Sequence, residues 1–209
     1  YDAIVHCAFD HSPKGDAEKI EANLNLFEAV RSIPCRRFVY ISSIDVYPKG
    51  KGPKLENQQV LPAPTDDSYR TIKLACEARL ENSDENNLIL RPTALLGKTA
   101  RPNSLIRMLR DPNCSLSLAP DSRFNYVTHH QLGAFILRAL HDGLSGVYNI
   151  ATTGSLGLRE VAEILATCPQ YGKFHYDVGD IDNRRARSVL PELARSTRDI
   201  VEEFMKAHE

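Results

Sequence analysis

Short apolar runs and helical repeats alternate along the first half of the chain. Three runs are typical of buried strands and cover residues 1–8, 37–43 and 88–92. After the first run, apolar residues recur at three- and four-residue steps from Ile20 to Val30, which predicts an amphipathic helix over residues 16–32. A second helix is predicted from Asp67 or Ser68 to about Glu81. This order predicts an α/β fold whose strands are parallel and joined by right-handed crossovers.

The pattern continues less regularly in the second half. Residues 48–67 are predicted to form a surface loop, because their prolines exclude any regular element longer than a turn. Short strands are predicted over residues 124–127 and 146–151. Helices are predicted around residues 105–109 and over residues 131–141, 158–166 and 200–207.

Tyr69 and Lys73 are the first candidates for chemistry. If both lie on the second predicted helix, their four-residue spacing places the two side chains on one face, about one turn apart. A tyrosine hydroxyl titrates near pH ~10, and a neighbouring ammonium lowers that pKa because it stabilises the phenolate. Ser43, at the end of the second predicted strand, would bring another hydroxyl to the same point. The three residues together predict a proton-transfer site.

Each of these features also has an interpretation without chemistry. Tyr69 and Lys73 could be an exposed pair on a helix, and the Ser43 hydroxyl could cap a turn. His6 lies in an apolar run and is expected to be a core histidine rather than a ligand. Two groups of basic residues are expected to be solvated, with a weak contact to an anionic ligand as the alternative for the second. The groups are Lys49, Lys51 and Lys54, and Arg184, Arg185 and Arg187.

Composition narrows the class of protein. The 209 residues carry a formal net charge of -1, which gives no general attraction to nucleic acid or to an anionic membrane. No apolar run approaches the ~18 residues that span a bilayer, and the first residues do not resemble a signal peptide. The five cysteines form no CxxC pair, so reduced thiols in the cytoplasm are expected. Small molecules are therefore the expected partners.

His129 and His130 are the most suggestive pair for a metal site. Adjacent residues point to different sides, however, and no third ligand stands at a useful spacing. We therefore expect no metal site and predict that the two histidines cap a helix.

Five segments, in this order, resemble the extended short-chain dehydrogenase/reductases of the NAD-dependent epimerase/dehydratase type. The family's Tyr-x-x-x-Lys motif resembles Tyr69 to Lys73, and its strand with a following small-residue pair resembles residues 38–47, with Ser42 and Ser43 as the pair. The weaker matches are residues 2–8, residues 91–97 and residues 147–151. A lone Tyr-x-x-x-Lys is common by chance, whereas five such segments in order are not.

The resemblance implies a Rossmann-like, doubly wound parallel sheet. Residues 1–100 would be the C-terminal portion of the dinucleotide-binding domain. Residues 101–209 would be mainly a small α/β substrate-binding part, with residues 124–151 returning to the core. The family's G-x-G-x-x-G loop has no counterpart in this sequence. We therefore expect that the N-terminal strands of the fold, roughly 50–70 residues or about two βα units, are absent from it.

The resemblance also implies a mechanism. Tyr69 would be the general acid/base, Lys73 would hold the nicotinamide ribose and lower the pKa of the tyrosine, and Ser43 would orient the reacting oxygen. The cofactor would be NAD or NADP. The residues expected beside it are His6, Cys7, Ala8, Ser42, Tyr69, Lys73, Arg91 and Pro92. For Arg91 the sequence favours a structural role over a substrate clamp.

The implied function is nicotinamide-dependent epimerisation, dehydration or reduction of a nucleotide-sugar or a related hydroxyl or carbonyl substrate. Many family members have Asn where this chain has Ala94, and an Asp pair where it has His129 and His130, which indicates a divergent branch. A homodimer is compatible with the apolar residues on the outer face of the helix at residues 16–32. The alternative function is that of a non-catalytic dinucleotide-binding protein of the same fold, with a regulatory or assembly role.

Overall fold

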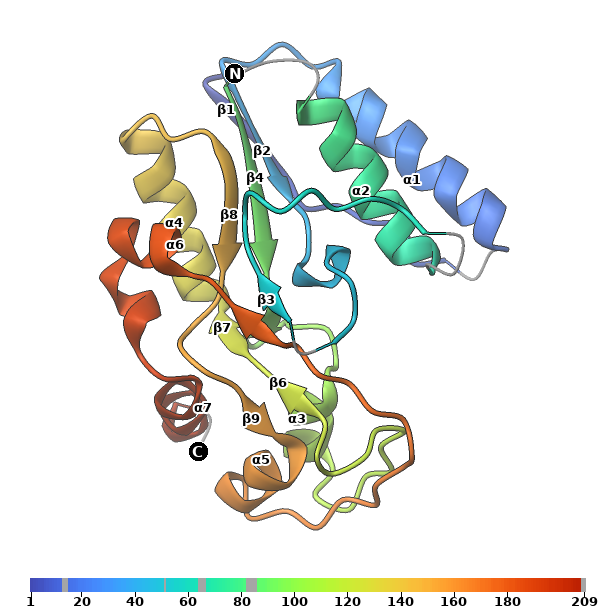
Figure 1. Ribbon diagram of the computed structural model, residues 1–209, viewed down its shortest axis with the longest axis vertical. Helices are drawn as coiled ribbons and strands as arrows, with labels where there is room; N and C mark the ends of the chain where they lie inside the picture. The colour runs from blue at the N-terminus through green and yellow to red at the C-terminus, as the bar shows by residue number, and fades with distance from the viewer. Residues whose placement is uncertain (13–14, 51, 64–66, 82–85, 208–209) are drawn as a thin grey trace.

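A four-stranded parallel sheet forms the centre of one half of the molecule (Figure 1). The computed structural model describes residues 1–12, 15–50, 52–63, 67–81 and 86–207. The strands follow the order β1-β2-β4-β8, and each neighbouring pair is parallel. Their bounds are Ala3–His6 for β1, Arg37–Ile41 for β2, Asn87–Pro92 for β4 and Gly146–Ile150 for β8. The predicted α/β fold with a parallel sheet is confirmed.

Helices cover both faces of this sheet, because successive side chains of a strand point to opposite sides. The helices are α1 (Asp16–Arg31), α2 (Ser68–Glu81), α4 (His129–His141) and α6 (Arg184–Val189). In β2, Phe38 and Tyr40 pack with Phe27 of α1 and Ile72 of α2, whereas Val39 belongs to the apolar cluster that includes α4. Figure 1 shows α1 and α2 on one side of the sheet and α4 and α6 on the other. Burial on both faces explains the continuous apolar runs in the sequence.

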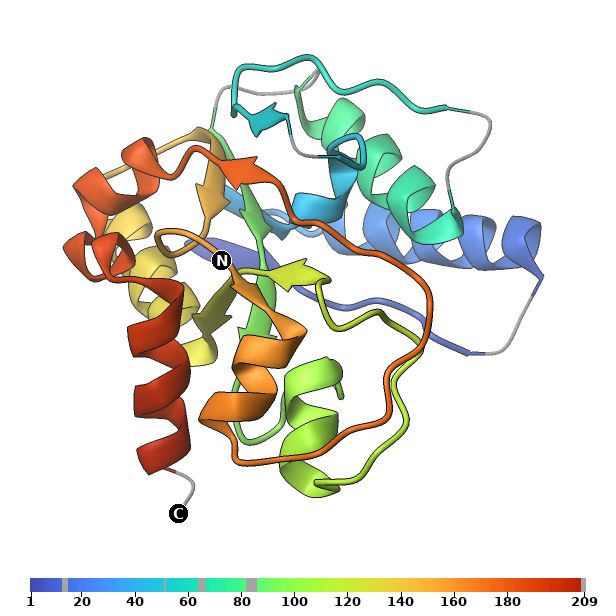
Figure 2. The same ribbon diagram turned by 60° about the horizontal axis from the view of Figure 1, so that its bottom comes forward.

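The other half of the molecule has its own apolar core. Figure 2 brings this half forward and shows α3, α5 and α7 gathered in it. Two strand pairs run through it, the parallel pair β5–β7 and the antiparallel pair β6–β9. The strands are β5 (Ala94–Leu96), β6 (Arg123–Phe124), β7 (Tyr126–Thr128) and β9 (Leu156–Gly157). The helices are α3 (Ser104–Arg110), α5 (Leu158–Ile164) and α7 (Thr197–Lys206). The 3-10 helix η2 (Pro191–Ala194) instead packs its Leu193 into the apolar cluster of the parallel sheet.

A short strand pair holds the C-terminal segment against the sheet half of the molecule. In the loop that follows the 3-10 helix η1 (Ile44–Val46), β3 (Pro53–Lys54) pairs in parallel with β10 (Asp180–Ile181). Beside this pair, the hydroxyl of Tyr47 lies 2.9 Å from the Asn149 amide oxygen. The C-terminal segment is therefore held against the loop that leads into α2.

One predicted strand is divided in the structure. Residues 124–127 were expected to form a single strand, but Asn125 separates β6 from β7. Its amide nitrogen donates to the carbonyls of Thr152 and Gly154 and to the Thr197 hydroxyl, and its oxygen accepts from Thr93. This buried network fixes the bend, because a buried polar side chain needs hydrogen-bond partners.

The start of α4 corrects a second prediction. Thr128, not His129 or His130, caps this helix: its hydroxyl accepts from the Gln131 amide at 3.1 Å, and the Gln131 side chain accepts from the Thr128 amide at 3.0 Å. The two histidines are the first two residues of the helix. Helix α6 was not predicted at all, although its arginines are exposed as expected.

Candidate active site

The candidate catalytic residues lie at the carboxyl ends of the parallel strands. Strand β2 ends at Ile41, and directly after it the Ser42 amide donates to the Leu90 carbonyl at 2.7 Å. Ser43 is the N-cap of η1, and its hydroxyl accepts a hydrogen bond from the Asp45 amide at 3.1 Å. This contact agrees with the alternative interpretation of Ser43, in which its hydroxyl caps a turn, and the catalytic role stays a prediction. This edge of an open parallel sheet is also where such folds bind ligands.

Helix α2 brings Tyr69 to the Ser43 hydroxyl. The Asp67 carboxylate accepts from the Arg70 amide at 2.8 Å and so caps the first turn of the helix. Burial raises the pKa of Tyr69, a hydrogen bond with the Ser43 side chain lowers it, and the charge of Arg101 lowers it further. The net result is a pKa above that of an ordinary tyrosine, so the hydroxyl is protonated at neutral pH.

Lys73 lies one turn further along α2 and is only 5% exposed. Its ammonium donates to the Ile41 carbonyl at 2.8 Å and lies over the Tyr69 ring, 5.6 Å from the ring centre. The rings of Phe9 and Tyr40 lie at 5.3 and 5.0 Å from the same ammonium. Burial lowers the pKa of Lys73 to about 8, because the surroundings replace little of the water that the charge has lost.

These contacts correct one expectation about the pair. The sequence correctly predicts that Tyr69 and Lys73 share a helix, but Lys73 is not among the main influences on the pKa of Tyr69. The ammonium donates to a backbone carbonyl and lies over the face of the ring, and burial dominates both groups. The lysine, rather than the tyrosine, has the lowered pKa.

A cavity of about 210 Å³ opens beside Tyr69, between the two halves of the molecule. Asp45 and Asp177 contribute carboxylates to its lining, and the hydroxyl of Tyr176 donates to Asp45 at 2.8 Å. Lys54 also lines it. This cavity offers both donors and acceptors beside the tyrosine side chain, within a mainly apolar lining, as is usual for small-molecule sites.

The burial of Lys54 contradicts the prediction of a solvated lysine loop. Lys54 is 5% exposed, and its ammonium donates to the Pro48 carbonyl at 3.1 Å. The pairing of β3 with β10 carries it inward. Lys49 is exposed as expected, and Lys51 lies outside the described residues.

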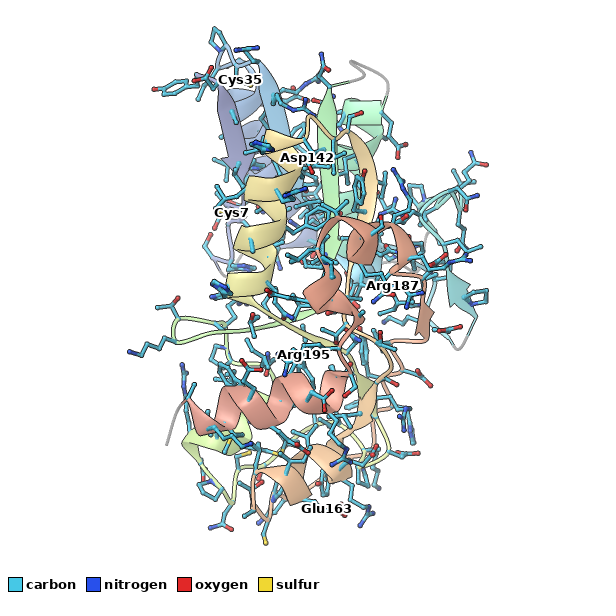
Figure 3. The ribbon with its side chains drawn as sticks, turned by 90° about the vertical axis from the view of Figure 1, so that its left-hand side faces the viewer. Cys7, Cys35, Asp142, Glu163, Arg187 and Arg195 are labelled. Carbon is cyan, nitrogen blue, oxygen red and sulfur yellow. The ribbon has the colours of Figure 1, made fainter. Side chains whose placement is uncertain are left out.

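The predicted cofactor residues of the first strand separate into two groups. His6 is buried and stacks on Tyr40 at 5.7 Å, in line with the expected core histidine, and burial lowers its pKa. Cys7 and Ala8 are exposed just beyond the carboxyl end of β1. Figure 3 shows Cys7 and Cys35 at opposite ends of the β1–β2 pair, and both thiols are free.

Ser42 is the most unusual of the predicted cofactor residues. Its side chain is buried, and within the part of the chain that the structure describes its hydroxyl has no hydrogen-bond partner. A buried hydroxyl without a partner costs about 1–3 kcal/mol. This cost marks Ser42 as a position where a ligand atom would be stabilising.

The structure places Arg91 in the interior. Its guanidinium contacts the Glu77 carboxylate at 2.6 and 3.1 Å and donates to the Tyr47 hydroxyl at 2.8 Å. Both charged side chains are 3% exposed, and the neighbouring Pro92 is also buried. These contacts agree with the structural role that the sequence favours for Arg91.

No metal or membrane feature emerges from the described residues. Within residues 1–12, 15–50, 52–63, 67–81 and 86–207, no group of three His, Cys, Asp or Glu side chains is arranged to hold a metal ion. In the same ranges, no helix combines the length and the apolar character that crossing a bilayer requires.

One family model matches the chain, that of the NAD dependent epimerase/dehydratase family, over residues 1–112. The chain belongs to this family. The matched range includes Ser43, Tyr69 and Lys73, so the resemblance expected from these residues is confirmed. A search of the curated proteins gave no match.

Solved structures share the fold over almost the whole chain. The dTDP-glucose 4,6-dehydratase of Bacillus anthracis, in complex with NAD, is 16% identical, with a TM-score of 0.75, and the match covers 98% of this chain and 71% of that chain. The UDP-glucuronic acid 4-epimerase of Bacillus cereus, in complex with NAD, is 18% identical, with a TM-score of 0.76 and coverage of 99% and 74%. The protein RMD of Pseudomonas aeruginosa, complexed with NADPH, is 20% identical, with a TM-score of 0.67 and coverage of 97% and 81%. At these identities the likeness establishes the Rossmann-like fold.

Several contacts of this family member were not foreseen from its sequence. Phe9 packs on Tyr69, with ring centres 5.1 Å apart, and its place directly after the first strand could have suggested this. Arg101 contacts His11, and Tyr176 contacts Asp45, across 90 and 131 positions of the sequence. No local pattern predicts such pairs.

Proposed function

We propose that this protein catalyses a nicotinamide-dependent epimerisation, dehydration or reduction of a nucleotide-sugar or a related hydroxyl or carbonyl substrate. The observation that carries the proposal is the placement of Ser43 and Tyr69 at the carboxyl ends of parallel strands, where the Ser43 side chain lowers the pKa of Tyr69, beside a cavity lined in part by charged side chains. Family membership and the nucleotide-sugar ligands of proteins with the same fold, such as MoeE5 in complex with UDP-glucose and NAD, support the substrate class.

The residues present fit a dinucleotide on one side of the site. Lys73 uses one hydrogen bond on the Ile41 carbonyl, which leaves further N–H groups for ligand hydroxyls. Among the described residues the Ser42 hydroxyl has no hydrogen-bond partner, and Cys7 and Ala8 are exposed at the carboxyl end of β1. We propose NAD or NADP as the cofactor, which accepts or supplies the hydride when bound.

The proton chemistry falls to Tyr69. Because its pKa is raised, the hydroxyl begins protonated and can donate to a carbonyl oxygen of the substrate, while the Ser43 hydroxyl orients that oxygen. The reverse reaction requires the phenolate, which is disfavoured in the ligand-free site. We therefore propose that Tyr69 acts first as an acid in the reductive direction.

The test compares Tyr69→Phe with the full-length wild-type protein. We expect dinucleotide affinity by calorimetry to stay within about twofold, while turnover falls by about 10²–10⁴, the usual range for loss of a general acid. Tyr171→Phe is the matched control, because Tyr171 lies away from this site and contacts Leu158. If the wild type binds neither NAD(H) nor NADP(H), the enzyme proposal fails. Dinucleotide binding without turnover on any nucleotide-sugar would instead favour the regulatory or assembly role.

Three further expectations from the sequence stay predictions. These are the division near residue 100, with residues 124–151 returning to the core, the cytoplasmic location and the homodimer. A groove between α1 and α2 supports the last, since it is lined by the apolar residues Ile20 and Leu24 and by the Glu28–Arg79 ion pair.

A further inference from the structure

Three basic side chains lie around the ring of Phe9, next to the candidate active site, and a fourth contacts one of them. We call them the cationic cluster: His11, Lys19, Lys73 and Arg101. The His11 ring lies 4.5 Å from the ring centre of Phe9, and the ammonium groups of Lys73 and Lys19 lie 5.3 and 5.9 Å from it. Four elements of the fold thus direct basic groups to one place, beyond the carboxyl end of β1.

Arg101 joins this cluster through His11. Its guanidinium nitrogen Nη1 lies 3.1 Å from Nδ1 and 2.9 Å from Nε2 of the His11 ring. Arginine is always charged in proteins, so this contact is tolerable only while the imidazole is neutral. Burial lowers the pKa of His11, and the charges of Arg101 and Lys19 lower it further.

The cluster has no balancing ion pair. In the part of the chain that the structure describes, the ion pairs join other side chains, and none connects a member of the cationic cluster to a carboxylate. Asp10 is the acidic group that acts on His11, and its carboxylate accepts from the Ser12 amide. Positive groups held together in this way repel one another, and a bound anion would remove that cost.

The cluster is in contact with the proton-transfer residues. Phe9 packs on the Tyr69 ring at 5.1 Å, and Lys73 lies over that same ring. The segment that carries Phe9 is fixed, because the buried Asn23 side chain accepts from the Asp10 amide at 2.8 Å and donates to the Asp10 carbonyl at 3.1 Å. An anion bound here would therefore belong to a ligand of the candidate active site.

We propose that the cationic cluster binds the phosphate or diphosphate group of a ligand of this site, with Arg101 as its principal contact. Arg101 suits this role because a planar guanidinium can donate two parallel hydrogen bonds to phosphate oxygens. The inference rests on the proposed function, since both the dinucleotide and a nucleotide-sugar carry a diphosphate. Either could supply the group, and the experiment distinguishes them.

The first measurement uses inorganic pyrophosphate as the probe, with calorimetry on the full-length protein. We expect Arg101→Ala to weaken pyrophosphate binding by about tenfold, the loss of one charge-assisted hydrogen-bond contact. Arg101→Lys keeps the charge without the planar geometry, so its affinity for pyrophosphate should lie between those of the wild type and Arg101→Ala. Arg110→Ala is the matched control, because Arg110 is an exposed arginine at the end of α3. It should match the wild type, and circular dichroism checks that each variant is folded.

The second measurement repeats the comparison with NAD and with UDP-glucose. If Arg101→Ala loses affinity for NAD alone, the site belongs to the dinucleotide. If it loses affinity for UDP-glucose alone, the site belongs to the substrate. The proposal is overturned if the wild type does not bind pyrophosphate, or if Arg101→Ala and Arg110→Ala bind all three probes as the wild type does. That result leaves the proposed function standing if Tyr69→Phe still abolishes turnover. Conversely, an Arg101-dependent pyrophosphate site in a protein that binds no dinucleotide would refute the proposed function and keep the anion site.

Discussion

The buried ion pair between Arg91 and Glu77 offers a quantitative test of the structure. Two nitrogens of the guanidinium contact the two carboxylate oxygens at 2.6 and 3.1 Å, and both side chains are 3% exposed. Arg91→Leu removes the guanidinium and leaves the Glu77 carboxylate buried without its partner. The Tyr47 hydroxyl loses a donor at the same time.

The expected loss follows from the burial of the remaining charge. Removing one partner of a buried ion pair costs about 3–5 kcal/mol of unfolding free energy. In a protein of this size, each kcal/mol lowers Tm by about 2–4 °C, so the melting temperature of Arg91→Leu should fall by about 6–20 °C. The double variant Arg91→Leu/Glu77→Leu leaves no buried charge. Its loss should be only about 1–2 kcal/mol, mainly because the Tyr47 hydroxyl no longer accepts from Arg91.

Urea unfolding followed by circular dichroism measures these differences, provided that unfolding is two-state. Arg110→Leu serves as the control, since it removes an exposed arginine and should change the unfolding free energy by no more than about 0.5 kcal/mol. The reasoning is refuted if the unfolding free energy of Arg91→Leu lies within about 1 kcal/mol of that of the wild type. It is also refuted if the losses of Arg91→Leu and Glu77→Leu add up to the loss of the double variant. A stable Arg91→Leu protein that has lost only its dinucleotide affinity would instead support the cofactor role expected for Arg91.

Two further predictions concern stability. Gly172→Ala should lower the unfolding free energy in urea by more than about 2 kcal/mol, because the added Cβ would lie 2.1 Å from the Ser117 carbonyl oxygen. Gly133→Ala in α4 should raise it by about 0.5–1 kcal/mol, because the Cβ there meets nothing within 4 Å. Equal effects of the two substitutions would contradict the packing. Lys73→Met should stabilise the protein at pH 7 by about 2–3 kcal/mol, because the lowered pKa of about 8 means that burying the ammonium costs free energy. This cost is fully present below pH 8 and fades between pH 8 and 10.5, so a gain that does not shrink over that range would contradict the account.

Periodicity in the sequence was enough to predict the central layers of the fold. Strands β1, β2, β4 and β8 are apolar runs because helices cover both of their faces, and α1 and α2 bury one stripe each. The four-residue spacing of Tyr69 and Lys73 likewise predicted that both lie on one helix, α2. These features depend on near neighbours in the sequence, which a local pattern reports directly.

The remaining features depend on contacts between distant segments. The two-residue strands β3 and β10 are too short to carry a pattern, yet their pairing buries Lys54. Asn125 bends a predicted strand because its partners, Thr152 and Thr197, come from later in the chain. The pKa of Tyr69 could not be inferred from Lys73 alone, because it depends on burial and on where the ammonium finds its acceptor.

The proposed anion site and Tyr69, the proposed proton donor, should be linked through Arg101. The charge of this arginine lowers the pKa of Tyr69, so an anion that neutralises it should raise that pKa further. Linkage is reciprocal, so the protonated Tyr69 hydroxyl must in turn favour anion binding. The ligand that fills the cationic cluster would thereby hold Tyr69 as an acid, ready to protonate a carbonyl oxygen. Ultraviolet titration of the wild type against Tyr69→Phe isolates this hydroxyl, and a titration that pyrophosphate leaves unchanged would rule the linkage out.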